Sequence, residues 1–156
     1  MQIEYLSDNP AMVDIVAQWI YDEFVNGIRP GRSYEQVLAV MGTHCRTSLP
    51  IRLVAVIGGV CVGTVSVVSN DLKFSDYTPW LAALYVDKAH RGKKIAEQLI
   101  ERVKEIVAGL GYNEVYLRTE HAGNYYKKRG WQYVETCTDE YNLNPDVFKF
   151  PLVGNC

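Results

Sequence analysis

The sequence predicts a mixed α/β fold that forms one domain over residues 1–156. Apolar side chains recur at three- and four-residue spacing over residues 12–24 and 95–110, as they do on amphipathic helices. Residues 51–68 are rich in β-branched side chains and are interrupted by a glycine pair, which is typical of a hairpin. Hydrophobic residues make up 48% of the chain and aromatic residues 12%, so a chain of this length can bury a real core.

The N-terminal third is expected to contain one strand and two helices. Residues 2–6 form a short strand, and Asp8 or Asn9 then caps a helix that has a proline in its first turn, where proline is tolerated. Ser33 and Gln36 have the spacing of a capping box at the start of a second helix. The apolar residues are Met12, Ile15, Val16, Trp19, Ile20 and Phe24 in the first helix, and Val37, Leu38, Val40 and Met41 in the second.

The central part is expected to hold a hairpin, a buried strand and the longest helix. The hairpin strands span 51–57 and 60–68, and a polar connection over 70–78 leads to a strand over 80–86. A helix follows from about residue 93 to residue 110. Its apolar face consists of Ile95, Leu99, Val103, Ile106 and Leu110, whereas Glu97, Glu101, Lys104 and Glu105 are expected to face outward.

The C-terminal part is expected to add three strands and one short helix. Residues 115–119 form a strand, and residues 122–129 form a helix that ends at Gly130. The last two strands span 131–136 and 147–152. This order of elements supports the mixed α/β class.

Composition excludes several functional classes. The net charge is −2, whereas general nucleic-acid or membrane-surface binders are usually basic, so neither kind of partner is expected. The N-terminus lacks a basic segment followed by an apolar one, and no apolar run is long enough to span a bilayer. The cysteines are far apart, so we expect reduced thiols in the cytoplasm and no metal site; they are Cys45, Cys61, Cys137 and Cys156.

The turn between the strand over 80–86 and the long helix has the features of an anion-binding site. Arg91, Gly92, Lys93 and Lys94 lie where the first amides of the helix have no partner within the helix. Free N–H groups, the positive end of the helix dipole and basic side chains therefore meet at one point. The sequence predicts a ligand that carries phosphate.

The strand-to-helix turn reads Arg91-Gly92-Lys93-Lys94-Ile95-Ala96. It resembles the signature [QR]-x-x-G-x-[GA] that the Gcn5-related N-acetyltransferase (GNAT) family has at such a turn. Lys94 departs from the signature because it stands where the family usually has glycine. The family's next landmark is a tyrosine four residues before a glycine–aromatic pair, which is matched here by Tyr126, Gly130 and Trp131.

The resemblance implies a fold, a donor and an acceptor. It implies a central, twisted and mostly antiparallel sheet of about six or seven strands, with splayed central strands and about four flanking helices. Acetyl-CoA would donate its acetyl group to a primary amine of a small molecule or peptide, by direct attack in a ternary complex. Its pyrophosphate would bind the amides of residues 91–96, and its pantetheine would pair with the backbone of Leu84, Tyr85 and Val86. A homodimer is also common in the family.

The same resemblance assigns Tyr126 as the general acid, because a phenol stays protonated at neutral pH. The base is open: Glu120, His121 and Glu23 are candidates for the base or for acceptor contacts. The acceptor side is expected to carry an acidic rim that suits a cationic amine. The carboxylates of this rim are Asp22, Glu23, Asp71, Asp76, Asp139 and Glu140.

The alternative function is a non-catalytic acyl-CoA-binding or sensor module.

Overall fold

A seven-stranded sheet in the order β1-β2-β3-β4-β5-β7-β6 forms the centre of the protein. The structure is a computed structural model that describes residues 1–73 and 75–152. All neighbouring strands are antiparallel except β4 and β5. The strands are β1 (Gln2–Tyr5), β2 (Ile51–Ile57), β3 (Val60–Val68), β4 (Trp80–Val86), β5 (Glu114–Thr119), β6 (Gln132–Thr136) and β7 (Asp146–Pro151).

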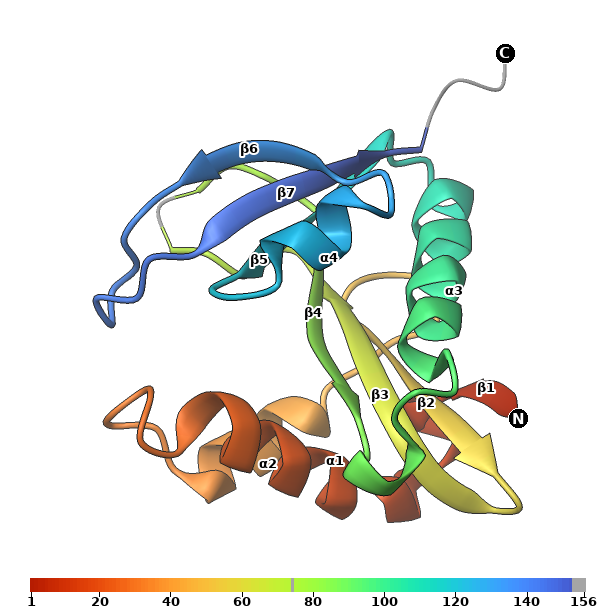
Figure 1. The fold of residues 1–156 in the computed structure, drawn as a ribbon. Helices are drawn as coiled ribbons and strands as arrows, with labels where there is room; N and C mark the ends of the chain where they lie inside the picture. Colours follow the sequence, from red (N-terminus) through yellow and green to blue (C-terminus); the bar gives the residue numbers. More distant parts are fainter. Residues whose placement is uncertain (74, 153–156) are drawn as a thin grey trace.

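Helices cover both faces of the sheet (Figure 1). Helix α3 packs on one face and forms the larger core cluster with side chains of the sheet. Helices α1 and α2 pack on the other face and form a second cluster with β2. The helices are α1 (Val13–Ile20), α2 (Tyr34–Met41), α3 (Ile95–Gly109) and α4 (Gly123–Lys127); short 3-10 or π segments are η1 (Leu6–Asp8), η2 (Pro10–Met12), η3 (Tyr21–Val25) and η4 (Lys88–His90).

The predicted mixed α/β class is confirmed, and the hairpin and the strand over 80–86 have the predicted bounds. The capping box is also confirmed: the Ser33 hydroxyl accepts from the Gln36 amide at 3.1 Å, and the Gln36 side chain accepts from the Ser33 amide at 2.9 Å. The first predicted helix differs, because it is divided into η2, α1 and η3. Periodic apolar residues identify a buried face but do not fix the hydrogen-bond register.

Two features of α3 differ from the expectation. The helix begins at Ile95 because Lys94 adopts the left-handed conformation, with φ 62° and ψ 24°. Lys104 was expected to face solvent, but its Nζ lies 3.6 Å from the centroid of the Phe150 ring. The aliphatic stem of a lysine can cover apolar surface while its charge stays near water, and here Glu101 accepts from Nζ at 2.9 Å.

The two central strands separate soon after they meet. β4 and β5 pair only at Trp80 and Tyr116, and the Tyr116 amide donates to the Pro79 carbonyl at 2.9 Å. The rest of β4 therefore has an edge that β5 does not cover. Trp80 is fully buried at this point of contact.

Two further expectations concern cysteines and membranes. Cys45, Cys61 and Cys137 are free thiols, and Cys156 lies outside the described residues. Within the described part of the chain, no helix combines the length and the apolar character that crossing a bilayer requires.

Candidate active site

The turn that leads into α3 presents free amides at the open end of β4. Gly92 has φ 81° and Lys94 has φ 62°, so the backbone curls just before the helix. The first helical hydrogen bond runs from the Gln98 amide to the Lys94 carbonyl at 3.2 Å. The preceding amides of the first turn have no partner within the helix, and the positive end of the helix dipole lies there. This geometry fits a pyrophosphate group.

Gly63 brings this helix end close to the sheet. A Cβ atom at Gly63 would lie 3.2 Å from the Tyr85 carbonyl oxygen, 3.3 Å from Leu99 Cδ1 and 3.4 Å from Ile95 Cγ2. The helix therefore packs directly against the backbone of β3. Its N-terminus is held beside the last residues of β4.

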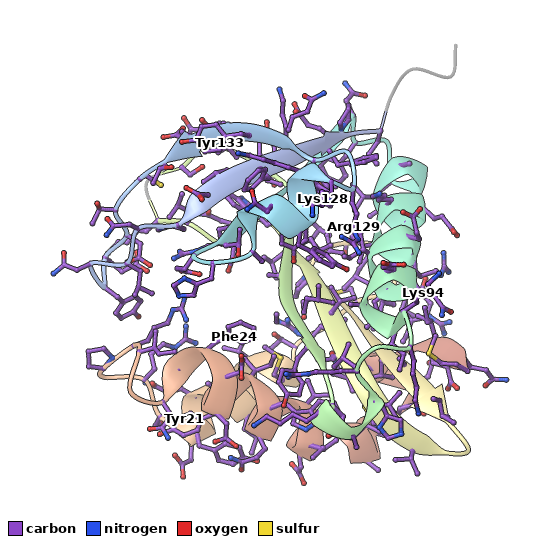
Figure 2. All side chains as sticks on the ribbon, viewed as in Figure 1. Tyr21, Phe24, Lys94, Lys128, Arg129 and Tyr133 are labelled. Carbon is purple, nitrogen blue, oxygen red and sulfur yellow. The ribbon has the colours of Figure 1, made fainter. Side chains whose placement is uncertain are left out.

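The basic side chains of the turn have different roles. The Nε of Arg91 donates to the Val86 carbonyl at 3.0 Å, and its guanidinium lies 5.3 Å from the Tyr85 ring centroid. Arg91 therefore holds the turn against β4. Lys93 and Lys94 are exposed, and Figure 2 shows Lys94 at the start of α3.

An ion pair joins the first turn of α3 to α4. Arg129 Nη2 lies 2.9 Å from Glu97 Oε1. The same guanidinium stacks 3.6 Å from the Tyr125 ring centroid, and Figure 2 shows Arg129 between the two helices.

A pocket of about 540 Å³ occupies the space between the splayed strands and the segments around α2. One wall is β4, which contains a β-bulge: two residues, Ala83 and Leu84, oppose Val65 alone, and Ala83 has φ 54°. A non-glycine residue in this conformation is strained and turns the local backbone out of the regular strand. Both bulge residues line the pocket.

Tyr126 lines the same pocket from α4. Its ring packs against Trp131, with centroids 5.8 Å apart, and against Phe148 at 6.4 Å. Burial raises the pKa of Tyr126 to about 12, so the phenol is protonated at neutral pH. None of the described residues hydrogen-bonds its hydroxyl. The side chain is thus held by its ring, and its proton remains available to a ligand.

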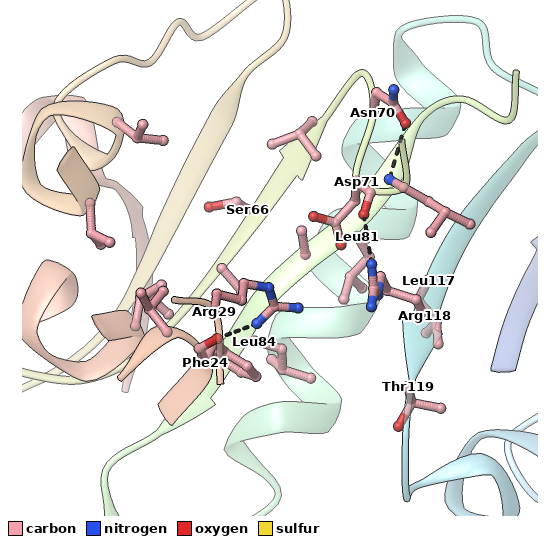
Figure 3. Close-up of a pocket in the computed structure, with 18 of the residues that line it drawn as sticks. Phe24, Arg29, Ser66, Asn70, Asp71, Leu81, Leu84, Leu117, Arg118 and Thr119 are labelled. Carbon is pink, nitrogen blue, oxygen red and sulfur yellow. Dashed lines mark hydrogen bonds between the residues drawn. The ribbon is translucent and has the colours of Figure 1, made fainter. Parts of the chain in front are cut away.

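Asp71 is the carboxylate that the pocket perturbs most. Burial raises its pKa to about 6, although the nearby charges of Arg118 and Arg29 act in the opposite direction. Figure 3 shows the Asp71 side chain in the pocket between these two arginines. A carboxyl group with a pKa near neutrality is suited to accept and release protons. The sequence offered Asp71 only as part of an acidic rim.

Arg118 contacts two carboxylates and a backbone carbonyl at one wall of the pocket. Its Nη2 lies 2.6 Å from Asp139 Oδ2 and 3.1 Å from Glu120 Oε1, and its Nη1 donates to the Asp71 carbonyl at 3.4 Å. Burial opposes ionisation of Asp139, but hydrogen bonds from Arg118 and from backbone amides lower its pKa overall. Glu120, one of the predicted base candidates, lines the pocket and is held in an ion pair.

The other two base candidates lie elsewhere. Glu23 is exposed on η3 and His121 is exposed after β5, and neither lines the pocket. Of the expected acidic rim, Asp71 and Glu140 line this pocket, whereas Asp22, Glu23, Asp76 and Asp139 do not. Asp139 pairs with Arg118. The pocket is also lined by several cations: Arg29, Arg32, Arg52, Lys73 and Arg118.

Comparison with known families and structures agrees with this geometry. The model of the acetyltransferase (GNAT) family matches residues 14–131, so the chain belongs to this family and is an acyltransferase. The comparison with curated proteins gives no match.

Several solved structures have a similar fold. One is an aminoglycoside 6'-N-acetyltransferase complexed with coenzyme A: the TM-score is 0.76 and the identity 17%, over 100% of this chain and 99% of that chain. The aminoglycoside 6'-N-acetyltransferase from Enterococcus faecium has a TM-score of 0.74 and 18% identity, with the same coverage. A GNAT acetyltransferase from Staphylococcus aureus Mu50 has a TM-score of 0.72 and 16% identity, over 97% of this chain and 100% of that chain. These TM-scores, over nearly complete chains, show a shared fold.

Proposed function

We propose that the protein transfers an acetyl group from acetyl-CoA to the amine of a small molecule. The observation that carries this proposal is the arrangement around β4: a free strand edge, a phosphate-suited turn at its end, and a pocket beside it that contains Tyr126 and Asp71. An extended amide chain such as pantetheine can pair with an open strand edge. Loop residues such as Arg29, Asp71 and Tyr141 line the pocket, which favours a small acceptor over a folded polypeptide.

The donor would lie along β4. The amides of residues 91–96 would bind its pyrophosphate, with Lys93 and Lys94 adding positive charge. The backbone of residues 84–86 would pair with its pantetheine. Backbone N–H groups aimed at a thioester carbonyl stabilise the negative charge that develops during acyl transfer. The bulge at Ala83 changes the direction of the backbone at this part of the strand.

The chemistry needs two proton movements. Asp71 accepts a proton from the ammonium form of the acceptor, which gives the nitrogen a free electron pair. The amine attacks the carbonyl carbon, the carbon–sulfur bond breaks, and the thiolate of coenzyme A leaves with a proton from Tyr126. The attacking nitrogen then loses a second proton, which the Tyr126 phenolate accepts directly or through solvent, and becomes the amide of the product. Asp71 releases its proton to solvent, so both side chains return to their starting states.

Release of coenzyme A tests this proposal directly. A thiol reagent would follow the release from acetyl-CoA across a panel of primary amines and aminoglycosides. Turnover with at least one amine is expected, and mass spectrometry should find an N-acetyl product. If acetyl-CoA binds but no amine is turned over, the protein is a non-catalytic acyl-CoA-binding module.

A further inference from the structure

A buried arginine without an acidic partner lies in the acceptor pocket. Arg52 is only 3% exposed, yet no described carboxylate forms an ion pair with it. Its Nε donates to the Thr43 carbonyl at 2.9 Å and its Nη1 donates to the Ser66 hydroxyl at 2.8 Å. Neither N–H of Nη2 donates to a described residue. Both Arg52 and Ser66 line the pocket.

A buried positive charge of this kind is costly unless an anion balances it. Burial lowers the pKa of Arg52 to about 10, with no carboxylate opposing the change. The contacts with Thr43 and Ser66 hold the guanidinium in place but supply no negative charge. A ligand group with a negative charge would supply it, and a guanidinium fork binds carboxylate and phosphate oxygens well.

The surrounding side chains extend this positive region. Arg118 and Glu120 pair with each other. Of the other charged residues that line the pocket, Arg29, Arg32, Arg52 and Lys73 are cationic, and Asp71 and Glu140 are acidic. A polycation would meet several like charges there. Ser66, Arg29 and Asp71, which are labelled in Figure 3, line the same pocket.

We propose that Arg52 and Ser66 form an anion subsite, so that the acceptor is an amine that also carries a carboxylate or phosphate. This inference rests on the proposed acetyl transfer, because it divides the acceptor between two ends of one pocket. The amine lies at the end that contains Asp71 and Tyr126, and the anionic group lies at Arg52. Ser66 can donate its hydroxyl proton to the same anion, because its oxygen accepts from Arg52.

Matched pairs of acceptors test the subsite. We would measure kcat/KM for a series of ω-amino carboxylic acids and for their carboxamides, with aminoalkyl phosphates and an aminoglycoside as further arms. The wild-type protein should prefer the best acid over its amide by on the order of 100-fold, because the amide leaves a buried charge unpaired. A preference for the phosphates instead would identify the anion as phosphate. Equal turnover of acid and amide, or a preference for the aminoglycoside, would overturn the proposal.

Variants separate binding from structure. Arg52→Gln should reduce the acid-to-amide ratio to near one, mainly through KM of the acid. Ser66→Ala should reduce it by about 10-fold and serves if Arg52→Gln fails to fold. Arg102→Gln, on the outer face of α3, is the matched control and should leave the ratio unchanged. If Arg52→Gln and Ser66→Ala both lower turnover of acid and amide equally, Arg52 is only structural.

A binding measurement distinguishes this proposal from the proposed function. The N-acetylated acid should raise the melting temperature more than its N-acetylated amide does. If that difference is present but no amine is turned over, the anion subsite stands and acetyl transfer is wrong. If amines are turned over without any preference for an acid, acetyl transfer stands and the anion subsite is wrong.

Discussion

Replacing Asp71 with asparagine should stabilise the fold and impair catalysis at the same time. The pKa of Asp71 is raised from 3.8 to about 6 in the folded protein. Between those values the folded state binds more protons than the unfolded chain, so stability falls as pH rises through this window. The difference between these two pKa values corresponds to about 3 kcal/mol of stability at pH 8, at about 1.36 kcal/mol for each tenfold change in proton affinity. Because the Asp71 side chain is only partly buried, we expect Asp71→Asn to gain about 1–3 kcal/mol at that pH.

Urea unfolding at pH 4 and pH 8 measures this effect. The gain should be present at pH 8 and nearly absent at pH 4, where the wild-type carboxyl is protonated in the folded state. Asparagine keeps the shape of the side chain and leaves the backbone carbonyl that accepts from Arg118. Asp76→Asn, an exposed aspartate in the same connection, is the control and should change neither stability nor turnover.

Kinetics completes the test of Asp71. In the wild type, kcat/KM should rise with pH through an apparent pKa of about 6, as ionised Asp71 becomes available. Asp71→Asn should lower kcat/KM by about 100-fold to 10,000-fold and remove this limb of the profile. An unchanged rate with an unchanged profile would refute the role of Asp71 as base. A stability gain that is equal at both pH values would refute the electrostatic reasoning.

Three other substitutions test the donor side of the site. Tyr126→Phe should lower kcat on the order of 100-fold. Stability and acetyl-CoA affinity should not change, because none of the described residues hydrogen-bonds the Tyr126 hydroxyl. Tyr125→Phe is the control, and equal rates for the two variants would contradict the role of Tyr126 as general acid. Lys94→Gly should raise the free energy of unfolding by about 1 kcal/mol, because glycine adopts φ 62° without strain. It should also weaken acetyl-CoA binding by about 2- to 5-fold, because the lysine charge is lost. Unaltered affinity in calorimetry would exclude a contact between Lys94 and phosphate. Gly63→Val should lower the free energy of unfolding in urea by about 1–3 kcal/mol and weaken acetyl-CoA binding, because a Cβ atom there would lie 3.2 Å from the Tyr85 carbonyl oxygen. Wild-type stability of this variant would show that α3 can move away from β3 without a loss of stability.

Much of the fold and of the donor turn could be predicted from local sequence. The hairpin is marked by β-branched residues around Gly58 and Gly59, and α2 by the Ser33 capping box. The signature around Arg91 and the downstream Tyr126 predicted the family, which the match over residues 14–131 confirms. These features depend on residues that are close together in the sequence, so they can be predicted without the tertiary structure.

The acceptor pocket could not be predicted in the same way. Its charged side chains come from segments that are far apart in the chain, such as Arg52 on β2 and Asp71 after β3. The acidic residues suggested a site for a cation, because sequence alone does not show that Asp139 pairs with Arg118. The sequence signal for Arg52 would have been an arginine within a strand that is rich in β-branched residues and is therefore expected to be buried.

The sequence by itself determined the elements, the strand-to-helix turn and the family, because each follows from periodicity, capping or a contiguous motif. Only the tertiary structure decided that Lys94 adopts a left-handed conformation, at which residue pair β4 and β5 separate, and that Asp71 and Arg52 share a pocket. The physical reason is that burial and charge pairing depend on which distant segments fold together. Those two quantities set the pKa of Asp71 and leave Arg52 without an acidic partner among the described residues.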